Sequence, residues 1–274
     1  MKKGNIFLCG GDKRSVYMAD YFSDMGYEVA AYGHGDEGSL ECISRADMIV
    51  LGLPAVKNGM VNMPLCDREL PFDELLTMCP GDVLLTGGRF TQKDLSLAKE
   101  HNIRIADYSE DEVFQLENAL YTAEGTLCAM IENTPCSLCG MRVLVTGGGR
   151  ISKALGNLLA CAPCKVSFYA RSELQRIFFA MQGYDVLSCL DDLSEFDVVI
   201  NTVPADILSR NALGTLKKDT VVIDLSERPG FVDKETCAEL GLKLIYLPGL
   251  PLASAPRSAG ITAAKAAERI LSNR

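Results

Sequence analysis

MRVLVTGGGRISKALGNLLACAPCKVSFYARS, residues Met141 to Ser172, reads as a β-branched strand, a glycine-rich turn, a helix and a second strand. This order is that of a βαβ unit that binds a dinucleotide. Gly147 permits a tight turn after the strand, and Gly149 lets the backbone approach a pyrophosphate at the start of the helix. Ser152 replaces the third glycine of the usual G-x-G-x-x-G pattern; it is small enough for close packing and can cap the helix. We expect a cofactor site, the alternative being a glycine turn that has lost its nucleotide.

The second strand of this unit is expected over residues 165–170, and Arg171 and Ser172 follow it. A site selective for NAD usually has an acidic residue here, which binds the ribose 2′-hydroxyl. Arg171 could instead pair with a 2′-phosphate through two hydrogen bonds, and the Ser172 hydroxyl could add another. The sequence therefore predicts NADP. Glu173 is an acidic neighbour that argues the other way, and the alternative for Arg171 is a solvated arginine at a strand end.

The chain has 274 residues, enough for two domains of about 130 residues that each bury a core. Its 48% hydrophobic and 23% charged residues are ordinary for a soluble enzyme. The net charge of −9 disfavours nucleic acid or an anionic membrane as the main partner, because either would need a concentrated basic face. An anionic ligand must therefore meet local positive charge.

Neither a signal peptide nor a membrane span is expected near the N-terminus, where Gly10, Gly11 and Asp12 interrupt a short apolar strand. Eleven cysteines are scattered through the chain, and this odd number suits a reducing compartment better than a disulfide scaffold. We therefore expect a cytoplasmic protein.

Two CxxC pairs, Cys136 with Cys139 and Cys161 with Cys164, precede the two strands of the glycine-rich unit. A four-thiolate zinc site at the N-terminal edge of the sheet is conceivable from this spacing. Such spacing also arises by chance in a cysteine-rich chain, and a cofactor would bind at the opposite edge. We predict no metal.

The first half of the chain repeats the organisation of the second. It has a strand over Asn5–Cys9, a turn over residues 10–12, a helix over Ser15–Met25 and a strand over Glu28–Tyr32. Further on, residues 46–54 resemble residues 196–204, and residues 81–87 resemble residues 219–225. Nearly continuous apolar runs indicate strands buried on both faces of a parallel sheet. The predicted fold class is α/β, with two Rossmann-like doubly wound parallel-sheet domains and a cleft between them.

The domains are expected over residues 1–117, an N-terminal α/β domain for substrate or partner, and 118–274, an NADP-binding Rossmann domain. A helical segment over Glu110–Asn133, broken near Tyr121 to Gly125, would join them. A C-terminal helix at about 253–274 could cross back to the first domain. Ligands of doubly wound sheets collect at the carboxyl ends of the strands, so the cleft is the expected active site.

Several segments resemble the dipicolinate synthase A chain family, and the resemblance spans almost the whole chain. The segments are residues 10–12, Asn118 with 122–126, 147–150, 170–172, 201–204, 228–230, 249–251 and 255–260. The resemblance implies NADP-linked oxidation of dihydrodipicolinate, or of its hydroxylated tetrahydro precursor, for endospore formation. It also implies that the partner is a flavoprotein-like B subunit, and we expect an oligomer. The chain departs from the family pattern at Tyr121, Ser152 and residues 252–254.

A dicarboxylate substrate needs cationic partners, and arginine can hold a carboxylate through two parallel hydrogen bonds. Arg14, Arg89, Arg228 and Arg257 are candidates, with Arg228 and Arg257 preferred because they lie in the family segments. The sequence also predicts a proton acceptor, Asp12 or Glu124, although either carboxylate could instead cap a helix. The predicted catalytic residues are Asp12, Glu124, Asn118, Arg228 and Arg257.

The cofactor is expected along the carboxyl ends of the strands of the second domain, where proline-containing loops order at little entropic cost. The predicted cofactor-binding residues are Gly147, Gly148, Gly149, Arg150, Ile151, Arg171, Ser172, Thr202, Val203, Pro204, Leu250 and Pro251.

Two other functions stay open. One is another two-domain NADP-dependent dehydrogenase, of the shikimate or methylenetetrahydrofolate type, with a different substrate pocket. The other is a non-catalytic NADP(H)-binding subunit, which the lack of a strong catalytic base permits.

Overall fold

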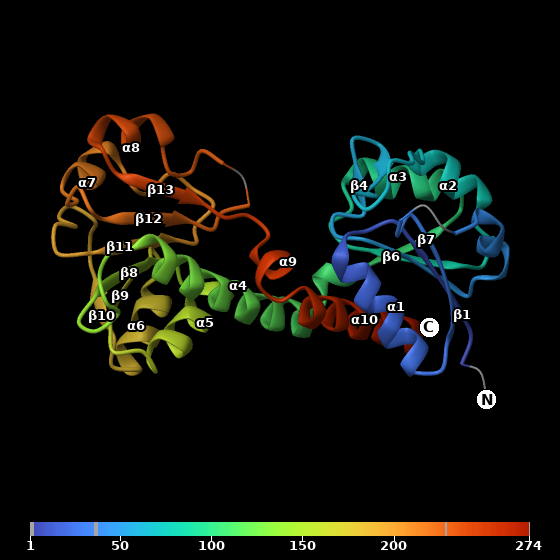
Figure 1. Cartoon of the computed structure of the whole chain (residues 1–274), viewed down its shortest axis with the longest axis horizontal. Coiled ribbons are helices and arrows are strands. Elements are labelled where there is room, and N and C mark those ends of the chain that lie inside the picture. The colour runs from blue at the N-terminus through green and yellow to red at the C-terminus, as the bar shows by residue number, and fades with distance from the viewer. Residues whose placement is uncertain (1–2, 36–37, 228, 274) are drawn as a thin grey trace. The chain divides into compact units, whose positions relative to one another are not determined.

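The computed structural model describes residues 3–35, 38–227 and 229–273, and the chain divides into two compact units (Figure 1). Unit 1 consists of Met1–Asn118 and Ala255–Arg274, and unit 2 of Ala119–Ser254. Helix α4 (Glu112–Asn133) carries the chain from unit 1 into unit 2. The C-terminal helix α10 (Pro256–Ser272) returns to unit 1, where it packs on α1 (Lys13–Asp24).

Unit 1 is built on five parallel strands in the order β2-β1-β3-β6-β7. The strands are β1 (Asn5–Cys9), β2 (Glu28–Tyr32), β3 (Met48–Leu51), β6 (Leu84–Gly87) and β7 (Arg104–Asp107). The chain therefore changes direction between β1 and β3, the kind of position where doubly wound sheets bind ligands.

Two cores cover the two faces of the first sheet. Alternate residues of β1 divide between them: Ile6 and Leu8 face α1, α10 and the start of α4, whereas Phe7 and Cys9 face the other core. That second core includes residues of α2 (Phe72–Met78), α3 (Gln92–Glu100) and a two-stranded hairpin, β4 (Val56–Lys57) with β5 (Met60–Val61). Two short 3-10 turns, η1 (Leu40–Arg45) and η2 (Tyr108–Glu110), complete the unit.

Unit 2 is built on six parallel strands in the order β10-β9-β8-β11-β12-β13, the usual order of a dinucleotide-binding sheet. The strands are β8 (Arg142–Thr146), β9 (Lys165–Tyr169), β10 (Asp185–Leu187), β11 (Val198–Asn201), β12 (Val221–Asp224) and β13 (Lys243–Tyr246). The reversal of strand order lies between β8 and β11.

Helices cover both faces of this sheet as well. Helix α5 (Arg150–Leu159), α6 (Glu173–Met181) and the second part of α4 contribute to one core, in which the rings of Phe168 and Phe179 stack with centroids 3.8 Å apart. Helices α7 (Arg210–Gly214) and α8 (Lys234–Leu240) contribute to the other. The short helix α9 (Leu250–Ser254) follows β13.

The predicted fold class is confirmed in each unit, because both sheets are parallel and have helices on both faces. The strands predicted from the apolar runs form at those runs. The cleft expected between the domains stays a prediction.

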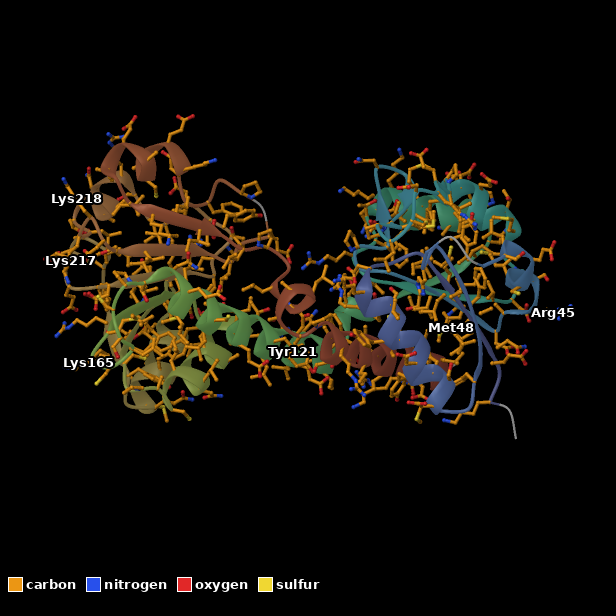
Figure 2. All side chains as sticks on the ribbon, in the orientation of Figure 1. Arg45, Met48, Tyr121, Lys165, Lys217 and Lys218 are labelled. Carbon is orange, nitrogen blue, oxygen red and sulfur yellow. The ribbon has the colours of Figure 1, made fainter. Side chains whose placement is uncertain are left out.

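The predicted break in the helical segment before the second domain is wrong. Helix α4 continues without interruption through Tyr121 (Figure 2). Gly125 does not end a helix; a Cβ there would lie 3.0 Å from the side chain of Leu250 and 3.1 Å from that of Ser254. The glycine is needed for close packing against α9. Glu124, in the middle of α4 and exposed, therefore caps no helix.

Candidate functional site

The glycine-rich turn between β8 and α5 leads a helix N-terminus away from the carboxyl end of the sheet. Gly147 has φ +106°, and its N–H donates to the carbonyl of Tyr169 at 2.7 Å. A Cβ at Gly147 would lie 2.4 Å from Oγ1 of Thr202, so only glycine fits. Gly149 is the N-cap of α5, which has no side-chain cap.

Ser152 does not cap the helix, so that expectation is corrected. It lies within α5 and is fully buried, and its Oγ is 2.9 Å from Oγ1 of Thr202. Thr202 donates to the carbonyl of Thr146 at 2.8 Å. The serine at the third position of the glycine pattern therefore links α5 to the ends of β8 and β11, which explains why a small polar residue is accepted there.

The start of α5 offers unused hydrogen-bond donors. Within the described part of the chain, the N–H groups of Gly148 and Gly149 donate to no protein acceptor. The first N–H groups of any α-helix also lack partners inside the helix. Nothing lies within 4 Å of a Cβ position at Gly149, and that residue is exposed. Free donors, open space and the positive end of the helix dipole together suit a phosphate group.

The corresponding turn of unit 1 is different, although its sequence looks similar. There the N–H of Gly11 donates to the carbonyl of Asn62 at 2.6 Å, and a Cβ at Gly10 would lie 2.6 Å from the side chain of Met63. The N-cap of α1 is Asp12, whose carboxylate accepts from the N–H of Arg14. The segment after β5 thus fills the first turn, and a carboxylate occupies its helix N-terminus. Of the two glycine-rich turns, the one in unit 2 suits an anion.

A buried polar network joins the carboxyl ends of three strands in unit 2. Asn201 accepts from Oγ1 of Thr146 at 2.8 Å and donates to Oδ1 of Asp224 at 3.0 Å. Its side chain also binds both the N–H and the carbonyl of Val203, at 3.2 and 3.0 Å. Thr146 and Asn201 are 0% exposed and Asp224 is 2% exposed. The network fixes the loop that begins at Thr202.

Sequence reasoning missed the two central members of this network, Asn201 and Asp224. Each ends an otherwise apolar run, at positions that pair with each other across neighbouring strands. A polar residue at the last position of a buried strand was the available signal.

The turn after β9 presents Arg171 to solvent. The backbone is held from below by Arg176, whose Nη1 donates to the carbonyls of Ala170 and Arg171 at 2.9 and 2.8 Å. Ser172 is the N-cap of α6 and its hydroxyl makes no capping hydrogen bond. An exposed guanidinium and a hydroxyl that caps no helix therefore stand at the strand end that distinguishes NADP from NAD.

The remaining predicted cofactor residues divide by exposure. Arg150 and Pro204 are exposed, Ile151 and Val203 are half-buried, and Gly148 lies beneath the side chain of Gln175, whose Cδ is 2.4 Å from a Cβ position there. Leu250 and Pro251, by contrast, are buried at the start of α9. Leu250 packs in the core beside the second sheet, which indicates a structural role for its side chain.

The predicted catalytic residues are less gathered. In unit 1, Asp12 is buried and binds Arg14, and Arg257 is exposed in the first turn of α10. Asn118 is half-buried in α4. Arg228 lies outside the described residues.

The two histidines serve other purposes. Burial lowers the pKa of His34, while a hydrogen bond between its Nε2 and the carbonyl of Gly10 raises it, and the net shift is downward. His101 is the C-cap of α3, and its Nε2 lies 2.7 Å from Oδ1 of Asp73.

No three histidine, cysteine or acidic side chains are arranged to hold a metal in the part of the chain that the structure describes, which includes all four CxxC cysteines. None of the described helices is long and apolar enough to cross a membrane.

Residues 5–109 match the N-terminal domain of the dipicolinate synthase A chain. The A chain of dipicolinate synthase from Bacillus subtilis (strain 168) is 24% identical to this chain, over 97% of the chain and 95% of the relative. The chain belongs to the dipicolinate synthase A chain family. A crystal structure of the family member from Bacillus halodurans superposes with a TM-score of 0.89 at 24% identity, covering 98% of each chain.

More distant structures share the fold beyond this family. A transhydrogenase from Sinorhizobium meliloti superposes with a TM-score of 0.69 at 13% identity, covering 98% of this chain and 93% of its own. The family fold is therefore that of two-domain nucleotide-dependent oxidoreductases.

Proposed function

We propose that this chain is the catalytic A chain of a dipicolinate synthase. In this proposal it oxidises dihydrodipicolinate, or its hydroxylated tetrahydro precursor, to dipicolinate with NADP. It acts in the cytoplasm, for endospore formation, as part of an oligomer and together with a flavoprotein-like B subunit. Membership of the family, whose named members are dipicolinate synthase chains, supports the substrate class.

The observation that carries the proposal is the start of α5. The N–H groups of Gly148 and Gly149 are unused, the helix has no side-chain cap, and the space over Gly149 is open. A pyrophosphate supplies the acceptors and the negative charge that this arrangement lacks. The residues present therefore fit a dinucleotide in unit 2. The filled turn of unit 1 argues against a second nucleotide there.

NADP is preferred over NAD because of the turn after β9. An unphosphorylated ribose needs an acidic partner for its 2′-hydroxyl, and Tyr169, Ala170, Arg171 and Ser172 provide none. The exposed guanidinium of Arg171 supports binding of a doubly charged 2′-phosphate, with the Ser172 hydroxyl as a further donor.

When bound, NADP supplies an acceptor for a hydride. The chain's part is to hold the reacting groups in position, which is where much of the rate enhancement of such a reaction arises. The loop from Thr202 to Pro204 is suited to this because the network around Asn201 fixes its backbone. Of the two carboxylates predicted to take the proton, Asp12 has both oxygens bonded to Arg14, so we keep Glu124 for this role. We also keep Asn118, Arg228 and Arg257 as proposed catalytic residues.

The test is the appearance of NADPH at 340 nm with the purified chain, NADP and freshly generated dihydrodipicolinate. The assay is run without and with the B subunit, then repeated with NAD. Turnover that prefers NADP is expected, and its dependence on the B subunit shows whether the partner is required. Tight NADP binding without turnover in either arrangement would refute the oxidation and favour a non-catalytic nucleotide-binding role.

A further inference from the structure

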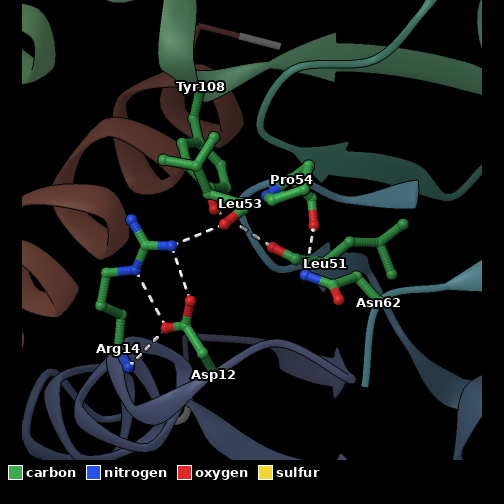
Figure 3. A network of polar contacts seen from close by, with 7 residues as sticks. All are labelled: Asp12, Arg14, Leu51, Leu53, Pro54, Asn62 and Tyr108. Atoms are coloured by element: carbon green, nitrogen blue, oxygen red, sulfur yellow. Dashed lines mark hydrogen bonds and ion pairs between the residues drawn. The ribbon is translucent and has the colours of Figure 1, made fainter. Parts of the chain in front are cut away.

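Arg14 lies in the first turn of α1, at the carboxyl edge of the first sheet, and Figure 3 shows its surroundings. Its Nε donates to Oδ1 of Asp12 at 2.9 Å, and its Nη2 donates to Oδ2 of the same carboxylate at 2.6 Å. Nη2 also donates to the carbonyl of Leu53 at 2.6 Å. The side chain is only 12% exposed.

The acceptors that hold this guanidinium are themselves held. Asp12 caps α1 by accepting from the N–H of Arg14 at 3.0 Å. The loop that contains Leu53 is fixed on both sides, because the carbonyl of Pro54 accepts from Asn62 at 3.0 Å and that of Gly52 accepts from Gly88 at 3.0 Å. The guanidinium therefore has one orientation before any ligand arrives, which lowers the entropic cost of using it.

Counting donors shows what is left over. A guanidinium has five N–H groups. Asp12 and Leu53 take three of them, from Nε and Nη2, and the two on Nη1 have no acceptor in the described part of the chain. No buried side-chain nitrogen or oxygen among the described residues lacks a hydrogen-bond partner, so Nη1 is open to solvent. A cation held this firmly, with one free donor atom at the ligand-binding edge of a sheet, is suited to an anion.

The charge environment is consistent with a binding role. Burial lowers the pKa of Arg14, but the hydrogen bonds and charge of Asp12 outweigh it, so the pKa is raised overall and the group is always charged. Asp12 compensates that charge while the edge is empty. Both of its oxygens face Arg14, so the carboxylate orients the arginine.

We propose that Nη1 of Arg14 binds one carboxylate of a dicarboxylate substrate, and that Asp12 is the positioning residue for this contact. This inference rests on the proposed function, which supplies the class of substrate. It assigns the substrate's carboxylate to unit 1.

The test compares two ligands that differ by one carboxylate, pyridine-2,6-dicarboxylate and pyridine-2-carboxylate, by titration calorimetry with NADP present. Arg14→Gln removes the charge and is compared with Arg269→Gln. Arg269 makes a similar two-bond pair with Asp111 in the same unit, at 3.1 and 2.5 Å, but away from the carboxyl edge of the sheet. Melting temperatures of both variants measure any loss of stability.

In the wild type we expect the dicarboxylate to bind about 10- to 100-fold more tightly than the monocarboxylate, the range for a hydrogen bond to a charged group. In Arg14→Gln this ratio should fall to about one, while Arg269→Gln keeps it. A merely structural arginine would lower the melting temperature without changing the ratio.

A wild-type ratio that survives in Arg14→Gln overturns the Arg14 site and leaves the proposed function intact. A loss of NADP affinity in Arg14→Gln, with the ratio unchanged, assigns the arginine to a cofactor phosphate and also overturns the proposal. Absence of binding of either pyridine ligand to the wild type, with NADP still bound, overturns the substrate class and the Arg14 site together.

Discussion

Gly149→Ala should separate cofactor binding in unit 2 from the stability of that unit, and Gly147→Ala is its control. At Gly149 φ is −80°, which any residue adopts, and an added Cβ meets nothing within 4 Å. At Gly147 φ is +106°, and the same methyl group would overlap Oγ1 of Thr202 at 2.4 Å. One substitution adds a group to open space where we place a pyrophosphate, and the other adds it to a packed core.

The magnitudes follow from these environments. Alanine at Gly149 loses some N-cap preference but restricts the unfolded chain, so the free energy of unfolding should change by less than about 1 kcal/mol. The new methyl group displaces a phosphate from the free N–H groups, and the loss of one charge-assisted hydrogen bond lowers affinity by about 10- to 150-fold. Alanine at Gly147 combines backbone strain with overpacking, and it should cost about 2 to 6 kcal/mol.

The assay is NADP titration by calorimetry together with thermal unfolding, without and with NADP. We expect Gly149→Ala to melt within a few degrees of the wild type and to lose most of the stabilisation that NADP gives. Gly147→Ala should melt lower even without cofactor. If Gly149→Ala binds NADP as tightly as the wild type, the pyrophosphate does not lie over this turn and the proposed cofactor site is wrong.

Arg171→Ala should weaken NADP binding by about 10-fold or more and leave NAD binding nearly unchanged, because the guanidinium meets only the 2′-phosphate; equal losses in the two titrations would refute the contact. Asn201→Ala leaves the buried carboxylate of Asp224 without its amide partner and should cost about 3 to 5 kcal/mol in chemical denaturation, so a cost below about 1 kcal/mol would show that the network is not needed. Arg269→Gln tests pH dependence. The hydrogen bond from Arg269 lowers the pKa of Asp111, so the pair stabilises the fold above the ordinary carboxyl pKa and loses this contribution as the pH falls through the lowered value. The difference in melting temperature between wild type and variant should therefore be constant from about pH 5 to 7 and shrink below about pH 4, and a difference that persists in strong acid would contradict it.

Much of the architecture could be predicted because it depends on local patterns. The runs MIVL over Met48–Leu51 and VVIN over Val198–Asn201 are apolar along their length, which only a strand covered on both faces requires. Both are 0–1% exposed at the apolar positions, and Met48 lies inside the first sheet (Figure 2). The glycine turn before α5 was equally readable, because a positive φ at Gly147 leaves few other residues possible.

The prediction failed where a residue's role depends on distant parts of the chain. Gly125 looks like a helix break in the sequence, but its missing side chain makes room for α9, more than a hundred positions further on. Ser152 looks like a cap, but it bonds to Thr202 at the end of another strand.

What the sequence by itself determined is the set of elements and their order: two parallel sheets, the turn at Gly147 to Gly149, and the arginine after β9. These depend on backbone conformation and on burial along short runs. Only the tertiary structure decided which glycine turn can hold an anion. Gly11 and Gly149 belong to similar local patterns, but the backbone of Asn62 occupies the first turn and nothing occupies the second. The tertiary structure also showed that Asp12 binds Arg14, because a carboxylate's role is set by the charges that folding brings beside it.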